Sequence, residues 1–216
     1  IYYQRPLDIS AVLNHLAQLD DTDPLAGTDT ERTIAIGHSF GGYTTFALGG
    51  AEYAIDELVN ECAEGTGPSA FCSGLSSENI TLFANGFYDD RILGTIPMAA
   101  GDYTLFRDPG YAALQSPTFQ LVGERDPATG GSSDPIWHAL ADSPHRQLMI
   151  LGGGHQTFTD FSGILEQFDG LIDAEEGHRI LRIYTLAYAQ YLLGHEDRLT
   201  ILDGHVSVSD RVLIVE

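Results

Sequence analysis

A serine flanked by glycines lies between an apolar stretch and a stretch compatible with a helix. Residues 34–46 read IAIGHSFGGYTTF, in which Gly37, Ser39 and Gly41 fit the pattern G-x-S-x-G. This pattern is typical of a nucleophile elbow, a tight strand-to-helix turn that raises the serine hydroxyl at the carboxyl edge of a sheet. Glycines are expected on both sides because larger residues would clash with the neighbouring chain. The sequence therefore predicts Ser39 as a nucleophile and the Phe40 N–H as an oxyanion donor. The alternative is a plain glycine-rich turn.

A serine nucleophile needs a base to remove its proton and an acid to orient that base. In this architecture the three residues follow the chain order serine, acid, histidine, each just beyond a strand. The stretch FQLVGERDPATG places Asp126 after one apolar run, and LMILGGGHQTF places His155 after the next. The sequence therefore predicts a triad of Ser39, Asp126 and His155.

Other acids and histidines compete for these roles. Asp102, in MAAGDY, also follows a predicted strand and is the alternative acid. Glu124 is expected to face solvent or a neighbouring helix, and His38 to pack or hydrogen-bond locally. Six further histidines lack a glycine-flanked strand exit and are interpreted as structural or surface residues: His15, His138, His145, His178, His195 and His205. Of these, His138 and His145 lie near the predicted site, so a role in catalysis stays open for both. No histidine spacing indicates a metal site, so no metal is expected.

The elements that must position these residues alternate between strands and helices. Strands are predicted at 32–38, 92–100, 116–124 and 146–153, and helices at 5–19, 41–54, 135–143 and 174–194. An irregular insertion is predicted at about 55–90 and a hairpin at 205–216. The helix at 5–19 is expected to present Ile9, Val12, Leu13, Leu16 and Leu19 on one apolar face. This order predicts a single α/β domain over 1–216, with a mostly parallel sheet covered by helices on both faces.

The amino-acid composition and net charge exclude several classes of protein and of partner. The chain has 216 residues, of which 43% are hydrophobic and 19% charged, as in a globular domain. The formal net charge is −21, and all ten basic residues are arginine. A surface this acidic repels phosphate backbones, which argues against a nucleic-acid partner. The acidity suits a salty or acidic habitat, but a general solubility role is the preferred explanation. No apolar run reaches the ~18 residues of a membrane span.

The two cysteines give information on the cellular compartment of the protein. Cys62 and Cys72 have nine residues between them in a polar stretch. A local disulfide is the preferred interpretation, and two free thiols are the alternative. A disulfide would imply export to an oxidising compartment, so a secreted or periplasmic location is expected. Two cysteines alone are too few for a tetrahedral zinc site.

The chain resembles the α/β-hydrolases, and is most similar to the bacterial dienelactone-hydrolase-like and platelet-activating-factor-acetylhydrolase-like group. The matching segments are RPLDISAVLNHL, IAIGHSFGGYTTFALGGA, the spaced cysteines, YDDRILGTIPMAAG, SPTFQLVGERDP and GGGHQTFTDF. The resemblance implies hydrolysis of small-molecule or polymeric carboxylic esters without a cofactor, with Ser39, Asp126 and His155 as the triad. In the acetylhydrolase branch the triad acid can come from the preceding strand, so Asp102 remains the alternative acid. Dienelactone hydrolases use a cysteine nucleophile, so dienelactone itself is not the expected substrate.

Two further expectations concern the surroundings of the site. The resemblance implies several strands before the elbow strand, but only 38 residues precede Ser39. We therefore expect an exposed sheet edge that a companion N-terminal polypeptide or another copy of the chain covers, and a second oxyanion donor from outside the chain. Apolar pocket walls are predicted for Phe40, Trp137 and Phe158. An amidase or peptidase with the same triad, and an inactive hydrolase-like binding module, remain the alternative functions.

Overall fold

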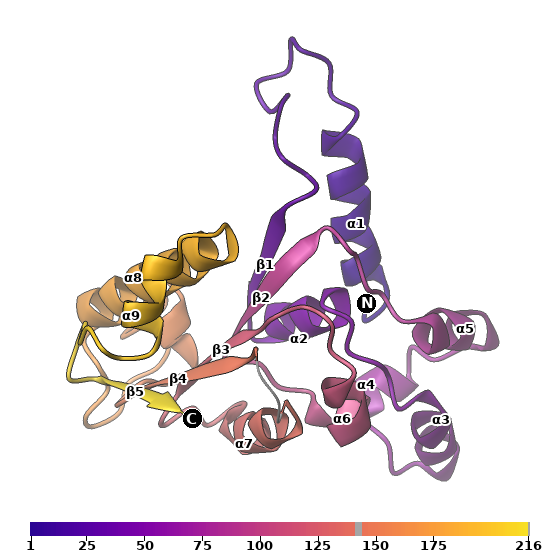
Figure 1. Cartoon of the computed structure of the whole chain (residues 1–216). Helices are drawn as coiled ribbons and strands as arrows, with labels where there is room; N and C mark the ends of the chain where they lie inside the picture. Colours follow the sequence, from indigo (N-terminus) through magenta and orange to yellow (C-terminus); the bar gives the residue numbers. More distant parts are fainter. Residues whose placement is uncertain (141–143, 216) are drawn as a thin grey trace.

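The computed structural model describes residues 1–140 and 144–215. In this part of the chain, one five-stranded sheet has the order β1-β2-β3-β4-β5 (Figure 1). Its strands are β1 (Thr33–His38), β2 (Ile92–Met98), β3 (Phe119–Gly123), β4 (Arg146–Ile150) and β5 (Val212–Val215). The first four strands are parallel, and β5 runs antiparallel beside β4. The prediction of an α/β protein with a mostly parallel sheet is confirmed.

Helices cover both faces of this sheet, as Figure 1 shows. On one face lie α1 (Gln4–Leu16), α2 (Phe40–Leu48), α6 (Tyr103–Ala112) and α7 (Gly130–Ala139). On the other lie α8 (Ala174–Leu192) and the short α9 (Leu199–Leu202). The remaining helices of the described ranges are α3 (Ile55–Glu64), α4 (Ser69–Cys72) and α5 (Ser77–Asn85). Within these ranges no helix has both the length and the apolar character needed to cross a bilayer.

The two larger hydrophobic cores fix most of the helices to the sheet. The first is aromatic and contains Tyr43, Phe46, Phe106 and Tyr111, all at most 1% exposed. The second lies under α8, where residues such as Tyr188 pack on the buried strand β3. Because the central strands are apolar and covered on both faces, the carboxyl ends of the parallel strands are held in a fixed arrangement.

Three elements differ from the sequence-based expectations. Residues 55–90 are not irregular, because α3, α4 and α5 occupy most of this segment. The predicted C-terminal hairpin is wrong: residues 205–211 form no strand, and β5 pairs with β4 instead. Helix α6 was not predicted, since it contains Pro109 and a break at Arg107, where φ is 57°. The last part of the helix predicted at 135–143 lies outside the described residues.

The sheet edge at β1 is exposed, as expected. No strand of the described chain pairs with the outer side of β1, and Ile36 on this strand is 53% exposed. The apolar face predicted for α1 is covered only in part, because Leu13 is buried while Ile9 and Val12 are 41% and 52% exposed. An unprotected edge with apolar neighbours favours the addition of another strand.

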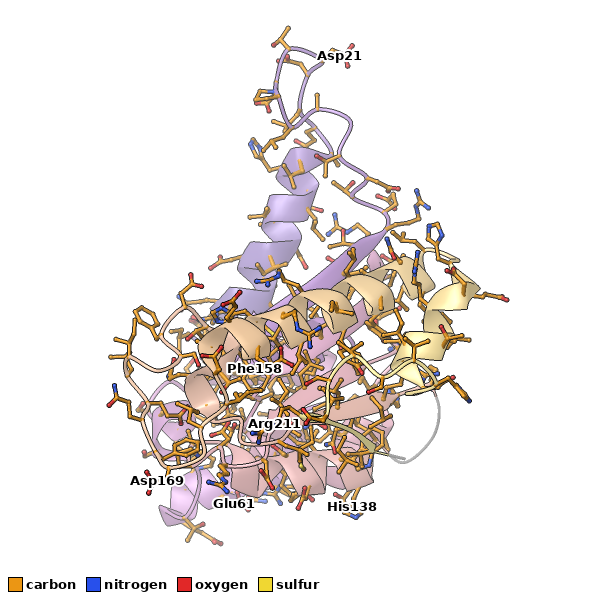
Figure 2. The ribbon with its side chains drawn as sticks, turned by 90° about the vertical axis from the view of Figure 1, so that its left-hand side faces the viewer. Asp21, Glu61, His138, Phe158, Asp169 and Arg211 are labelled. Carbon is orange, nitrogen blue, oxygen red and sulfur yellow. A yellow bond between two sulfur atoms is a disulfide. The ribbon has the colours of Figure 1, made fainter. Side chains whose placement is uncertain are left out.

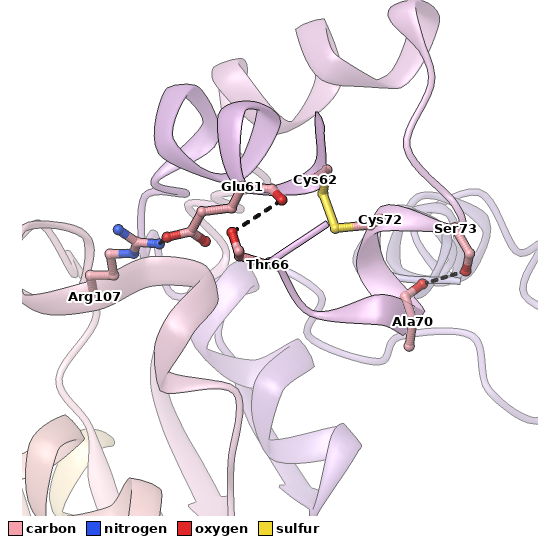
Figure 3. Close-up of a disulfide and its surroundings, with 7 residues drawn as sticks. All are labelled: Glu61, Cys62, Thr66, Ala70, Cys72, Ser73 and Arg107. Carbon is pink, nitrogen blue, oxygen red and sulfur yellow. Dashed lines mark hydrogen bonds and ion pairs between the residues drawn. A yellow bond between two sulfur atoms is a disulfide. The ribbon is translucent and has the colours of Figure 1, made fainter. Parts of the chain in front are cut away.

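A disulfide closes the helical segment between α2 and β2. Cys62 at the end of α3 and Cys72 in α4 are bonded, which confirms the predicted pair (Figure 3). The bond closes a loop of about ten residues, for which chain entropy predicts a stabilisation of roughly 3 kcal/mol or a little less. Next to it, Arg107 of α6 forms an ion pair with Glu61 of α3. The disulfide and the ion pair together hold α3 and α4 against the turn in α6.

Candidate active site

The residue between β1 and α2 has an unusual backbone conformation. Ser39 has φ 56° and ψ −118°, outside the regions that most residues other than glycine adopt. Its N–H donates to the Met98 carbonyl at the end of β2 (2.8 Å), which fixes the turn to the sheet. Phe40 is the first residue of α2, so its N–H has no partner within the helix. The turn therefore presents a hydroxyl and a free N–H side by side at the positive end of a helix.

The two glycines of the pentapeptide are not equivalent. A Cβ on Gly37 would lie 2.3 Å from the Gly41 carbonyl oxygen, a backbone atom that cannot move without opening the turn. A Cβ on Gly41 would meet nothing closer than an Arg5 guanidinium nitrogen at 3.9 Å. The expectation that both flanking glycines are sterically required is therefore correct for Gly37 and wrong for Gly41.

This difference predicts opposite outcomes for two matched substitutions. We expect Gly37→Ala to destabilise the protein by about 3 kcal/mol, because the added methyl group overlaps backbone. It should also displace Ser39 and lower the rate of ester hydrolysis at least tenfold. Gly41→Ala, which adds the same methyl group in open space, should cost far less in both respects. Thermal unfolding and initial rates measure the pair, and equal losses would contradict the steric account.

The structure brings the three predicted residues together at the carboxyl edge of the sheet. His155, in the short 3-10 helix His155–Phe158 after β4, has its Nε2 3.0 Å from the Ser39 Oγ. Its Nδ1 lies 2.9 Å from an Asp126 carboxylate oxygen, in the turn after β3. The arrangement is consistent with a neutral imidazole that donates from Nδ1 to Asp126 and accepts from the Ser39 hydroxyl. A proton can therefore pass from Ser39 to His155.

The Asp126 carboxylate is saturated with donors. One oxygen accepts from the N–H groups of Ala128 (2.7 Å) and Thr129 (2.9 Å), and the other from the Thr129 hydroxyl (2.6 Å) and His155. Burial raises the pKa of Asp126, but the hydrogen bonds from Thr129 and His155 outweigh burial and hold the pKa below its ordinary value. Asp126 is therefore ionised at neutral pH and oriented toward the imidazole.

Two residues that hold the backbone of His155 were not assigned this role from the sequence. Both carboxylate oxygens of Glu166 accept backbone hydrogen bonds, from His155 (3.0 Å) and Gln156 (2.9 Å). His38 donates from Nε2 to the His155 carbonyl oxygen (2.8 Å), which agrees with the local hydrogen bond expected of it. Burial lowers the pKa of His38, so its neutral form is favoured. Glu166 had no detectable signal, because it lies in an irregular loop after the histidine.

The competing acids and histidines lie elsewhere. Asp102 precedes α6 and makes no hydrogen bond to His155 in the described structure. Glu124 does not simply face solvent or a helix, because it accepts from the Gly152 N–H (2.8 Å) and holds the turn after β4. His138 donates to the Asp134 carbonyl on α7 and lies at the lower edge of Figure 2. His145 precedes β4, so it belongs to the opposite edge of the sheet from His155.

One of the three predicted wall residues reaches the space beside the nucleophile. A cavity of about 440 Å³ there is lined by Ser39, Phe40, Gly101, Asp102, Tyr103, Thr104, Ala128, Thr129 and Ser132. Trp137 instead packs against the aromatic core, and Phe158 is buried under α8, near the centre of Figure 2, stacked on His38. Neither lines this cavity or the neighbouring one described below. Both side chains are used to build the cores.

Comparison with known proteins does not assign the chain to a family. Neither the known protein families nor the curated proteins give a match for the chain. Over residues 1–140 and 144–215, no group of three or more histidine, cysteine, aspartate or glutamate side chains is placed to hold a metal ion. The functional assignment therefore rests on the arrangement of Ser39, His155 and Asp126.

Proposed function

We propose that the chain is a serine hydrolase of the α/β-hydrolase fold that cleaves carboxylic esters through an acyl-enzyme. The observation that carries the proposal is the continuous hydrogen-bonded series from Ser39 through His155 to Asp126, with Ser39 on a turn of positive φ. Backbone strain of this kind is retained where a site needs it. Short acyl, aryl or lipid-like esters are the proposed substrates, as small molecules or as polymers.

The hydrogen bonds of the triad indicate the order of the proton transfers in the proposed reaction. His155 takes the Ser39 proton as the hydroxyl oxygen attacks the ester carbonyl, and Asp126 stabilises the imidazolium that forms. The Phe40 N–H stabilises the oxyanion. His155 then protonates the leaving alcohol, and in the second half-reaction it activates the water that releases the acid from Ser39. No metal or organic cofactor takes part in this scheme.

The rates on paired substrates test the proposed bond specificity. We expect the purified protein to hydrolyse p-nitrophenyl acetate and butyrate much faster than the corresponding p-nitroanilides. A preference for anilides would replace the esterase by an amidase or peptidase with the same triad. No turnover of either series would favour an inactive hydrolase-like binding module.

The exposed sheet edge supports a proposal about assembly. Ile36 on β1 and Ile9 and Val12 on α1 leave apolar surface beside the unpaired strand, and α1 with its following loop projects at the top of Figure 1. We propose that a companion N-terminal polypeptide or a second copy of the chain covers this edge. The same partner would supply the second oxyanion donor. Native mass spectrometry should detect a species heavier than the 23.4 kDa chain. A monomer of that mass with full esterase activity would contradict the proposal.

The disulfide bears on where the protein works, and the net charge bears on which substrates it accepts. A bonded Cys62–Cys72 pair is consistent with an oxidising compartment, so we propose a secreted or periplasmic location. The net charge of −21 disfavours polyanionic substrates and nucleic acid. Both arguments point to an exported enzyme that acts on neutral or cationic esters.

A further inference from the structure

One acidic side chain lines the cavity beside the nucleophile. Of the nine residues around this space of about 440 Å³, Asp102 is the only acidic or basic one. It stands in the turn between β2 and α6, in the same lining as Ser39 and Phe40. Ser39 and Asp102 therefore border the same space, so a substrate held there can contact both residues.

The Asp102 carboxylate has no partner among the described residues. It occupies the position before α6 where an aspartate usually caps the helix, but its side chain accepts no hydrogen bond there. No ion pair reaches it in the described ranges, whereas Asp108 on the same helix accepts from the Tyr103 hydroxyl (2.6 Å). Asp102 is partly buried, and burial raises the pKa of its carboxyl group. The carboxylate oxygens are not among the buried atoms, so the carboxylate is open to the cavity and available to pair with a cationic ligand.

The adjoining space contains charges that are already paired. A second cavity of about 770 Å³ shares Tyr103 and Thr104 with the first and extends to the disulfide-closed segment at Gly67 and Pro68. Its Arg107 is paired with Glu61, as Figure 3 shows. This second cavity offers room for the rest of a substrate, but the unsatisfied charge is that of Asp102.

We propose that Asp102 is a cation subsite and that the protein prefers esters that carry an ammonium group close to the scissile bond. The proposal rests on the ester hydrolysis proposed above. A cationic group would pair with the carboxylate, and the aromatic ring of Tyr103 in the same lining favours a quaternary ammonium. The net charge of −21 adds a long-range attraction for such substrates.

Two esters of nearly identical shape test the subsite. Acetylcholine and 3,3-dimethylbutyl acetate differ in one atom, a charged nitrogen in place of a carbon. At low ionic strength we expect the wild-type kcat/KM to be about tenfold higher for acetylcholine. In Asp102→Asn the ratio should fall close to one. Asparagine adopts the left-handed backbone of this position (φ 65°) readily, so the variant is expected to fold.

A matched variant separates the local charge from the overall charge. Asp90→Asn removes the same single charge from an exposed residue at the amino end of β2, opposite the site. This variant should keep the wild-type ratio for the two esters. A ratio near one in the wild type, or the same ratio in wild type and Asp102→Asn, would overturn the inference.

A binding measurement keeps this test independent of turnover. Tetramethylammonium added to the full chain should shift NMR signals of residues around the cavity, with an affinity at least fivefold weaker in Asp102→Asn than in wild type or Asp90→Asn. If p-nitrophenyl acetate is hydrolysed but neither measurement depends on Asp102, the cation subsite is wrong and the esterase stands. If no ester is hydrolysed but binding depends on Asp102, the subsite stands and the proposed esterase is wrong. Failure of both measurements overturns the subsite.

Discussion

Ser39→Ala should lower kcat for p-nitrophenyl acetate by about 10⁶-fold, which is the effect of losing the nucleophile in serine hydrolases. The Ser39 hydroxyl is the group 3.0 Å from the His155 Nε2, so its removal leaves the base without a nucleophile to activate. Alanine keeps the Cβ of serine and hence the same backbone cost at φ 56°. The fold should therefore persist, and circular dichroism and the thermal midpoint should change little.

The matched control for this variant is a serine that belongs neither to the triad nor to the cavity lining. Ser207→Ala makes the same chemical change at an exposed position before β5 and should keep the wild-type rate. If Ser39→Ala retains more than a few per cent of activity while folded, another group attacks the ester and the elbow has a different role.

Asp126→Asn is expected to lower kcat by about 10⁴-fold with little change in KM. All four contacts of the Asp126 carboxylate come from donors, so an amide group must turn its NH₂ toward at least one of them. If the amide N–H faces His155, the imidazole is forced into the tautomer whose Nε2 carries hydrogen and cannot accept the Ser39 proton. The loss should appear in kcat across the pH range in which the wild type is active.

A comparison with the alternative acid makes this result decisive. Asp102→Asn should reduce the rate on the neutral p-nitrophenyl acetate far less than Asp126→Asn, because Asp102 makes no contact with His155. Thermal unfolding of both variants shows whether any loss comes from the fold. A nearly normal rate for Asp126→Asn with a large loss for Asp102→Asn would transfer the orienting role to Asp102.

The sequence allowed the convergence of Ser39, Asp126 and His155 to be predicted, because each follows an apolar run that reads as a strand. Parallel strands bring their carboxyl ends to one edge, so residues far apart in the chain meet there. The residues that hold His155 in place could not be found in this way. Glu166 reaches back from a loop without periodicity, and no spacing rule connects such a residue to the site.

The largest departures in the fold have local physical causes. Gly65, Pro68 and Gly74 interrupt residues 55–90 and favour an irregular segment, although the apolar residues of α3 recur at helical spacing: Ile55, Leu58, Val59 and Cys62. The C-terminal alternation predicts a hairpin, but β5 instead pairs with β4, and its Val212 and Ile214 pack against the core under α8. Local patterns specify an element, whereas its partner depends on the completed sheet.

Packing also decided the roles of the aromatic residues. Phe40 is fixed next to Ser39 by the elbow itself, so its place in the cavity lining followed from the motif. Phe158 follows His155 by three residues, yet the 3-10 turn directs its ring into the core beneath α8. Asp102 was considered only as an alternative acid, and its place in the cavity emerged from the structure.

Labelling with a fluorophosphonate probe, followed by peptide mass spectrometry, tests the central claim most directly. The probe reacts with a serine only when a neighbouring base has activated it. We expect one adduct per active chain, on the peptide that contains Ser39, and its loss in Ser39→Ala and after denaturation. Intact folded protein that forms no adduct, or forms it on another residue, would contradict the claim that Ser39, His155 and Asp126 act together.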